Sequence, residues 1–147
     1  MKLLDTSSLD WVHFTGGDRF DYPIDYWASV LNTRADGHID MLFRWEPSSY
    51  CHFHRHLVDA TTTVLKGEHH VIEIKQGKEV EHKVRLIGDY AHKPAGDAHM
   101  EYAGPTGSLL LFNMYAPDGQ LFEILDKDEN VIAPVSTEDI MTRRLAR

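Results

Sequence analysis

Residues 51–56 read CHFHRH and residues 88–99 read GDYAHKPAGDAH, and these two stretches decide the fold. In the first stretch every second residue is a histidine, so an extended strand places all three imidazoles on one face. In the second stretch a Pro/Gly turn at residues 94–96 precedes His99. Two imidazoles on one strand and a third beyond a turn can hold a single metal ion, so the pattern predicts a metal site.

Outward from these stretches, short apolar or alternating runs are separated by Gly, Pro and Asp, a pattern typical of β-strands joined by tight turns. About ten such runs in one chain favour a β-sandwich or β-barrel. The expected strands are Trp27 to Asn32, Ile39 to Trp45, Thr62 to Lys66, His70 to Ile74, His82 to Leu86, Tyr90 to Lys93, His99 to Tyr102, Leu109 to Met114, Phe122 to Leu125 and Val131 to Ala133.

A helix signal is present only near the C-terminus. Ser136 precedes Asp139 at capping-box spacing, and Ile140, Met141 and Leu145 can share one face of a helix. The sequence therefore predicts a short C-terminal helix after the strands.

Composition excludes several classes of partner. The chain has 147 residues, the size of one domain, and we expect a single domain over residues 1–147.

A formal charge of -8 repels nucleic acid, and no apolar run is long enough to span a membrane. Cys51 is the only cysteine, so no intrachain disulfide forms, and alternation predicts a core residue facing away from the ligand histidines. We expect a cytoplasmic protein with no nucleic-acid or membrane partner.

Together the two stretches resemble the motifs of the cupin superfamily. The second cupin motif, G-x5-P-x-G-x2-H-x3-N, is matched by Gly88, Pro94, Gly96 and His99. The first, G-x5-H-x-H-x3,4-E-x6-G, is matched by His54, His56 and Gly67. The resemblance implies an all-β double-stranded β-helix, the jelly-roll barrel of cupins, and a metal ion bound by His54, His56 and His99.

Two positions depart from the cupin motifs. The motif glutamate would fall near Ala60 or Thr61, and the motif asparagine would be Ala103. We therefore expect a three-histidine site that lacks the usual carboxylate. The candidates for a further ligand or a supporting residue are His52, Asp59 and Glu73, and the candidates for the pocket wall are Arg44, Tyr102 and Tyr115.

Among cupins, the resemblance is closest to acetylacetone-cleaving and dihydroxyacetophenone dioxygenases and to the cupin domain of ChrR-type anti-sigma factors. Three neutral imidazoles leave about half the positions of a six-coordinate ion open to a chelating anion and dioxygen. The leading hypothesis is a non-haem Fe(II) dioxygenase that cleaves a C–C bond of a β-diketone or hydroxyketone. Zn or Ni is the alternative metal. The alternative functions are a zinc-binding sensory cupin and a non-catalytic sugar-binding or isomerase-like cupin, and we expect a homodimer or homotetramer.

Overall fold

The computed structural model describes residues 2–142, and nearly all of its regular structure is strand. A single 3-10 turn and one short α-helix complete it. The elements are β1 (Val12–Thr15), η1 (Gly17–Arg19), β2 (Asp25–Thr33), β3 (His38–Trp45), β4 (His54–His56), β5 (Ala60–Lys75), β6 (Lys78–Arg85), β7 (Tyr90–Lys93), β8 (Ala98–Tyr115), β9 (Gln120–Leu125), β10 (Val131–Ser136) and α1 (Thr137–Thr142).

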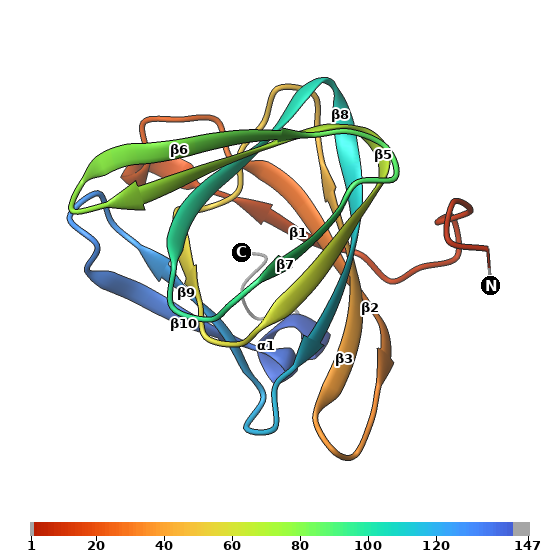
Figure 1. The fold of residues 1–147 in the computed structure, drawn as a ribbon. Coiled ribbons are helices and arrows are strands. Elements are labelled where there is room, and N and C mark those ends of the chain that lie inside the picture. The colour runs from red at the N-terminus through yellow and green to blue at the C-terminus, as the bar shows by residue number, and fades with distance from the viewer. Residues whose placement is uncertain (1, 143–147) are drawn as a thin grey trace.

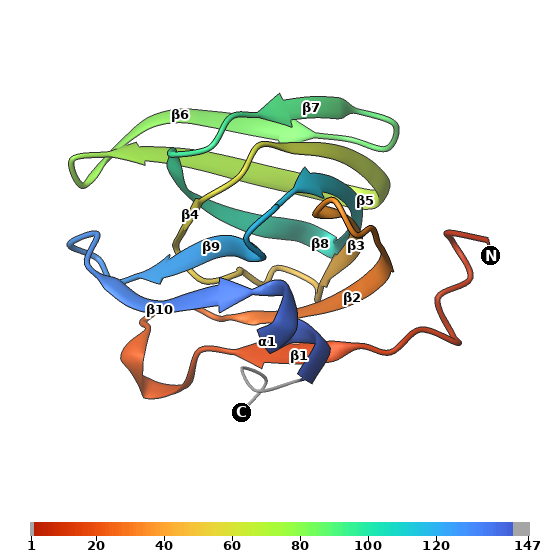
Figure 2. The same cartoon turned by 90° about the horizontal axis from the view of Figure 1, so that it is seen from below.

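The strands form one antiparallel sheet that curls into a barrel (Figure 1). Seen from below, β5, β6 and β7 make one layer and β1, β2, β9 and β10 make the other (Figure 2). The long strand β8 joins the two layers. It pairs with β5 in the first layer, and its other partners, β3 and β4, pair with β2 and β9 of the second layer. The predicted all-β architecture is confirmed.

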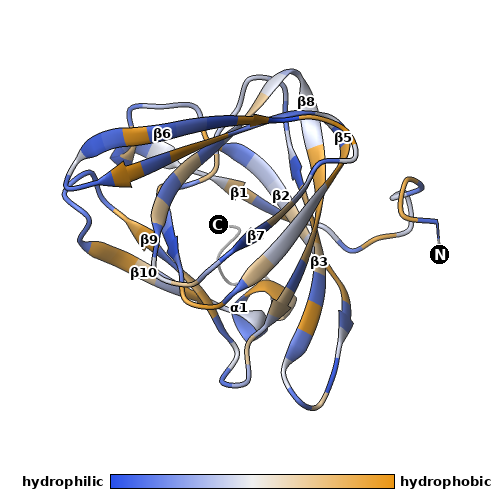
Figure 3. Ribbon diagram, viewed as in Figure 1, coloured by the Kyte–Doolittle hydropathy of each residue, from blue (hydrophilic) through white to orange (hydrophobic). Residues whose placement is uncertain are grey.

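Alternation along each strand sends one set of side chains into the barrel. On β3 the inward residues Met41, Phe43 and Trp45 are buried, whereas Arg44 between them is partly exposed. Figure 3 shows hydrophobic and hydrophilic segments alternating along β3 and β6. The inward apolar side chains form the core that drives folding, since each one fully buried is worth about 1.5–3 kcal/mol.

Two glycines allow β5 and β8 to cross as long bent strands. Sequence reasoning expected two strands within each of these elements, but each is continuous through register shifts near Gly67. Gly67 has a φ of 76°, and a Cβ atom there would lie 1.9 Å from the carbonyl oxygen of Gly107. The glycines interrupt the apolar alternation, which is why each strand reads as two in the sequence. Strand β1 was missed altogether.

The predicted C-terminal helix is confirmed as α1. The Ser136 hydroxyl accepts a hydrogen bond from the Asp139 amide at 3.1 Å, and the Asp139 carboxylate accepts one from the Ser136 amide at 3.0 Å. This is a capping box in which aspartate takes the usual place of glutamate. Ile140 is buried, and Leu145, expected on the same face, lies outside the described residues.

Within residues 2–142, no helix is both long enough and apolar enough to cross a membrane.

Candidate metal centre

Strand β4 presents two of the three predicted histidines to the barrel interior. His54 and His56 are two residues apart and both are buried, while Arg55 between them is partly exposed. The third histidine arrives through strand pairing, because His54 lies directly opposite His99 on β8. Sheet register thus brings together residues that are 45 positions apart in the sequence.

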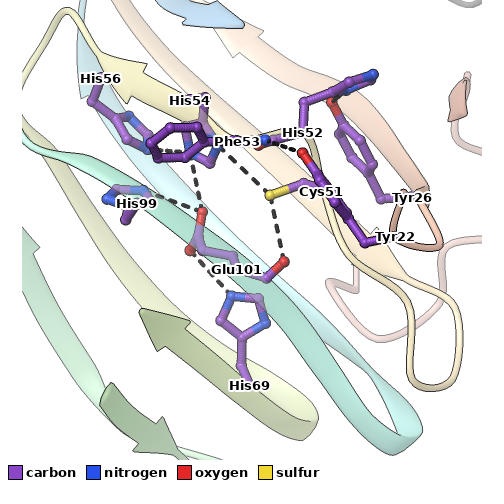
Figure 4. A network of polar contacts seen from close by, with 10 residues as sticks. All are labelled: Tyr22, Tyr26, Cys51, His52, Phe53, His54, His56, His69, His99 and Glu101. Atoms are coloured by element: carbon purple, nitrogen blue, oxygen red, sulfur yellow. Dashed lines mark hydrogen bonds and ion pairs between the residues drawn. The ribbon is translucent and has the colours of Figure 1, made fainter. Parts of the chain in front are cut away.

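The imidazoles converge on a fourth side chain, that of Glu101 (Figure 4). The Nε2 atom of His54 lies 3.2 Å from Nε2 of His56 and 3.3 Å from Oε2 of Glu101. The same Oε2 atom lies 3.4 Å from Nε2 of His99. One ligand atom from each of these four buried residues lies within 4.8 Å of the other three.

Glu101 corrects the expectation of a site without a carboxylate. It follows His99 at strand spacing on β8, so period-two alternation sends both side chains inward. That spacing was a usable signal in the sequence. Sequence reasoning missed it because it searched for the carboxylate where the cupin motif places it, near Ala60 and Thr61.

A buried histidine holds the second oxygen of Glu101. Nε2 of His69 lies 3.1 Å from Oε1 of Glu101, and Nδ1 of His69 lies 3.0 Å from the hydroxyl of Ser108. Burial lowers the pKa of His69, which favours the neutral ring. In the neutral ring, Nε2 donates to the carboxylate and Nδ1 accepts from Ser108. Oε2 therefore stays directed at His54 and His99.

The cluster carries an uneven distribution of protons. Burial alone would raise the pKa of Glu101, but the surrounding histidines hold it well below its usual range. Burial also opposes a charge on His54, but the Cys51 sulfur and Glu101 beside it raise the pKa of His54 to about 10. Burial and the charge on His54 lower the pKa of His99 to about 4. In the absence of metal, one proton therefore resides on His54 beside the ionised Glu101.

The donor atoms fit a divalent metal ion. Two ligands about 2.1 Å from one ion are about 3.0 Å apart at a right angle and about 3.4 Å apart at the tetrahedral angle. The contacts of 3.2, 3.3 and 3.4 Å lie at or between these values. In addition, Nε2 of His99 is buried without a hydrogen-bond partner in the described part of the chain. A cation would satisfy this nitrogen and replace the proton on His54.

Cys51 is a core residue as predicted, but its side chain and that of His52 point in directions that simple alternation did not predict. The chain between β3 and β4 is not regular strand at residues 51–53, so simple alternation fails there. The ring of His52 turns to Tyr26, with Nδ1 2.9 Å from the tyrosine hydroxyl. Cys51, expected to face away, instead places its sulfur 3.7 Å from Nδ1 of His54. Both side chains are buried, but neither belongs to the group of four donors.

Neither of the carboxylates considered as a fourth ligand joins the cluster. The side chain of Asp59 is 65% exposed and accepts a hydrogen bond from the Ala95 amide at 2.9 Å. Its place next to the inward-facing Ala60 turns it outward. Glu73 lies opposite His99 in the sheet but is only partly buried, and it is not one of the four donors. Glu101 takes the role for which these two residues were considered.

A narrow, largely apolar cavity of about 20 Å³ adjoins the cluster, room for about one water molecule. The three side chains predicted for a pocket wall lie elsewhere, because each is one position out of phase with an inward residue. Arg44 lies over Trp11 and Trp27, Tyr102 stacks on His70, and Tyr115 is half exposed. The cavity is lined by Tyr26, Phe43, Trp45, Cys51, His54, His56, Glu101, Phe112, Met114 and Phe122.

Comparisons with known proteins agree on the fold. No protein-family model and no curated protein sequence matches the chain. Among solved structures, an acetylacetone dioxygenase from Acinetobacter johnsonii is similar with a TM-score of 0.68 and 17% identity, over 91% of this chain and 85% of that one. A proposed acetylacetone dioxygenase from Methylibium petroleiphilum PM1 has a TM-score of 0.68 and 18% identity, over 100% and 95% of the two chains.

A single-residue variant of oxalate decarboxylase from Bacillus subtilis is also similar, with a TM-score of 0.56 and 17% identity. The match covers 73% of this chain but only 30% of that longer protein. The fold is thus the cupin double-stranded β-helix, with a buried cluster of three histidines and one glutamate that could bind a metal ion. At these identities the likeness shows the fold alone.

Proposed function

We propose that this protein is a metal-dependent dioxygenase that cleaves a C–C bond of a small enolisable substrate, a β-diketone or a hydroxyketone. The observation that carries the proposal is the convergence of four donors, His54, His56, His99 and Glu101, inside an apolar barrel. The similarity of the fold to acetylacetone dioxygenases supports the substrate class.

Four protein ligands would leave two positions of a six-coordinate ion open. A bidentate enolate matches this arrangement, because its two oxygens need adjacent positions and its charge offsets the remaining positive charge of the site. With Glu101 as a fourth ligand no further position is left for dioxygen, so dioxygen would meet the bound enolate in the cavity and not on the metal. Iron(II) is the proposed metal, and when bound it would supply the reaction with dioxygen that protein side chains cannot perform. The protein's own contribution is to hold the ion, orient the chelating oxygens and exclude water.

Each part of the site has a role in this scheme. His69 keeps Oε1 of Glu101 occupied, which favours coordination through Oε2 alone and preserves an open position on the metal. Phe112 and Phe122 line the cavity with apolar surface, which keeps bulk water from the reacting atoms. Met114 is the flexible member of the wall, and we expect it to move when a substrate larger than water enters.

The test combines metal analysis with oxygen consumption. Protein purified without oxygen is expected to contain one iron per chain and to consume oxygen with one or more members of a panel of β-diketones and hydroxyketones. His56→Ala is the matched control, since it removes one ligand and leaves the rest of the barrel intact. Iron without oxygen uptake on any member of the panel would refute the proposed reaction while leaving the metal site in place.

A zinc site is the second candidate, and two of the donor separations support it. Contacts of 3.3 and 3.4 Å are near the tetrahedral value, and zinc in structural sites takes four such protein ligands. Such a site would leave no open position and would suit a sensory or regulatory cupin. One zinc per chain, with no oxygen uptake after exchange for iron, would select this alternative.

A further inference from the structure

Lys93, at the end of β7, points into the same barrel. It pairs with Ala60 on β5, whose side chain faces the interior, and its neighbour His92 is exposed on the outside. The Nζ atom of Lys93 is buried and donates no hydrogen bond to any group in residues 2–142. A buried ammonium without a partner is costly, so a lysine at this position indicates an anionic partner from outside the chain.

Strand register places this ammonium on the inward face of the barrel, because Lys93 pairs with Ala60 and Ala60 pairs with Met114 of the cavity wall. Its charge acts on His56, His69 and His99, whose pKa values burial lowers first and Lys93 lowers further. Burial likewise lowers the pKa of Lys93, and Glu101 is the strongest of the charges that act on it. Lys93 is thus an inward-facing group whose charge acts on the metal cluster, although it does not line the cavity and the proposed function does not use it.

The charges around Lys93 leave room for a further anion. Lys93, Arg85, Lys83 and the protonated His54 supply four positive charges, while Glu101 and Glu73 supply two negative ones, so the metal-free group has a net charge of +2. A divalent ion in the cluster would replace the proton on His54 and raise the total to +3, and a chelating enolate would return it to +2. A second negative group on the same ligand would lower the net charge further and would pair with the ammonium of Lys93, which lacks a partner.

We propose that Lys93 binds a carboxylate of the substrate, so that the substrate is an enolisable ketone with a carboxylate in addition to its two metal-binding oxygens. The inference rests on the proposed function in one respect, because it takes the two chelating oxygens of the substrate to be bound by the metal. It narrows the substrate class from neutral diketones to oxo acids. A lysine with a purely structural role would pair with Glu73 or Glu101, and Lys93 makes no hydrogen bond to either.

The test uses two probes that differ by one carboxylate, acetylacetone and acetylpyruvate (2,4-dioxopentanoate). Protein loaded with nickel in place of iron binds the probes without turnover, and calorimetry gives both dissociation constants. The wild-type protein is expected to prefer acetylpyruvate. Lys93→Met should weaken acetylpyruvate binding about 10- to 100-fold, the usual range for a charge-assisted hydrogen bond, and acetylacetone binding less than about threefold. Lys93→Arg, which keeps the charge, should retain most of the preference.

Two further measurements keep the result interpretable. Nickel content and the melting temperature of each variant report metal binding and folding separately, and Lys93→Gln replaces the Met variant if that variant does not fold. Equal losses for both probes, or no loss for acetylpyruvate, would overturn the role of Lys93 alone. If the nickel-loaded wild type binds neither probe, the chelating pocket of the proposed function fails together with this inference.

Discussion

At the scale of single residues, the assignment of His54, His56 and His99 as ligands makes a direct prediction about metal content. Replacing any one of them with Ala should abolish stoichiometric metal binding, because a buried donor with no substitute is lost. His52→Ala should keep the metal, since that ring is directed to Tyr26. Metal content after gel filtration checks all four variants. Loss of metal in His52→Ala with retention in His56→Ala would reverse the assignment.

Glu101 and Glu73 form a matched pair for testing the carboxylate. Both face the region of His99 from neighbouring strands, but only Glu101 lies in the cluster. Glu101→Gln keeps the shape and removes the charge, so metal affinity should fall at least about tenfold. Glu73→Gln should change it less than about twofold. Competition with a chromophoric chelator measures both affinities, and an equal effect of the two substitutions would contradict the role given to Glu101.

The sequence predicted the histidine ligand candidates but not the carboxylate, and the reason is physical. His54, His56 and His99 lie at cupin motif spacings, whereas Glu101 occupies a position that the motif leaves unspecified, so only its alternation with His99 marks it. His52 and Cys51 show the opposite failure. Alternation was applied to them, but the backbone at residues 51–53 is not extended strand.

At the scale of elements, Gly67 makes the crossing of β5 and β8 possible. Gly77 serves as its control, because both glycines have a φ of 76° and only Gly67 is crowded. Gly77→Ala should cost about 1–2 kcal/mol of stability for the left-handed backbone alone. Gly67→Ala should cost at least about 4 kcal/mol, because its Cβ would overlap the Gly107 carbonyl. Urea unfolding of both variants gives the two values, and equal costs would show that the strands can separate to admit a methyl group.

Strand positions followed from the sequence better than strand lengths did. The expected segment Tyr90 to Lys93 coincides with β7, and each of the other expected strands overlaps an observed one. The bends at Gly67 and Gly107 could not be predicted, because a glycine between two apolar runs is as typical of a turn as of a bend within a strand. The pocket wall was mispredicted because of strand alternation. Arg44, Tyr102 and Tyr115 each lie next to an inward residue, so their own side chains face outward.

At the scale of the whole molecule, the expected homodimer remains a prediction. The residues of β6 are exposed except for the partly exposed Arg85, and the strand pairs only with β5 within the described residues. Its free edge carries the exposed side chains of Val80 and Val84, and an unpaired edge of this kind favours association with another strand. Light scattering at micromolar concentration should return twice the mass of one chain. A monomer mass would exclude the dimer under those conditions.

The last prediction concerns the pH dependence of the metal-free protein, which the histidine pKa values determine. Burial lowers the pKa of both His52 and His99 to about 4, below the unfolded value near 6.5. As pH falls from 6.5 to 4, the unfolded chain binds more protons than the folded one, so stability falls by about 1.4 kcal/mol per pH unit for each proton. The pKa of His54 is raised to about 10, so its contribution is complete below pH 6.5 and is lost as pH rises toward 10. Metal-free protein should therefore be most stable near pH 6.5.

Excess zinc should remove the decline above that pH, because a bound cation takes the place of the proton on His54 and binds more tightly as that proton leaves. Urea midpoints from pH 4 to 10, with and without zinc, test this, and a decline above pH 6.5 that persists with zinc would show that the cation does not replace that proton.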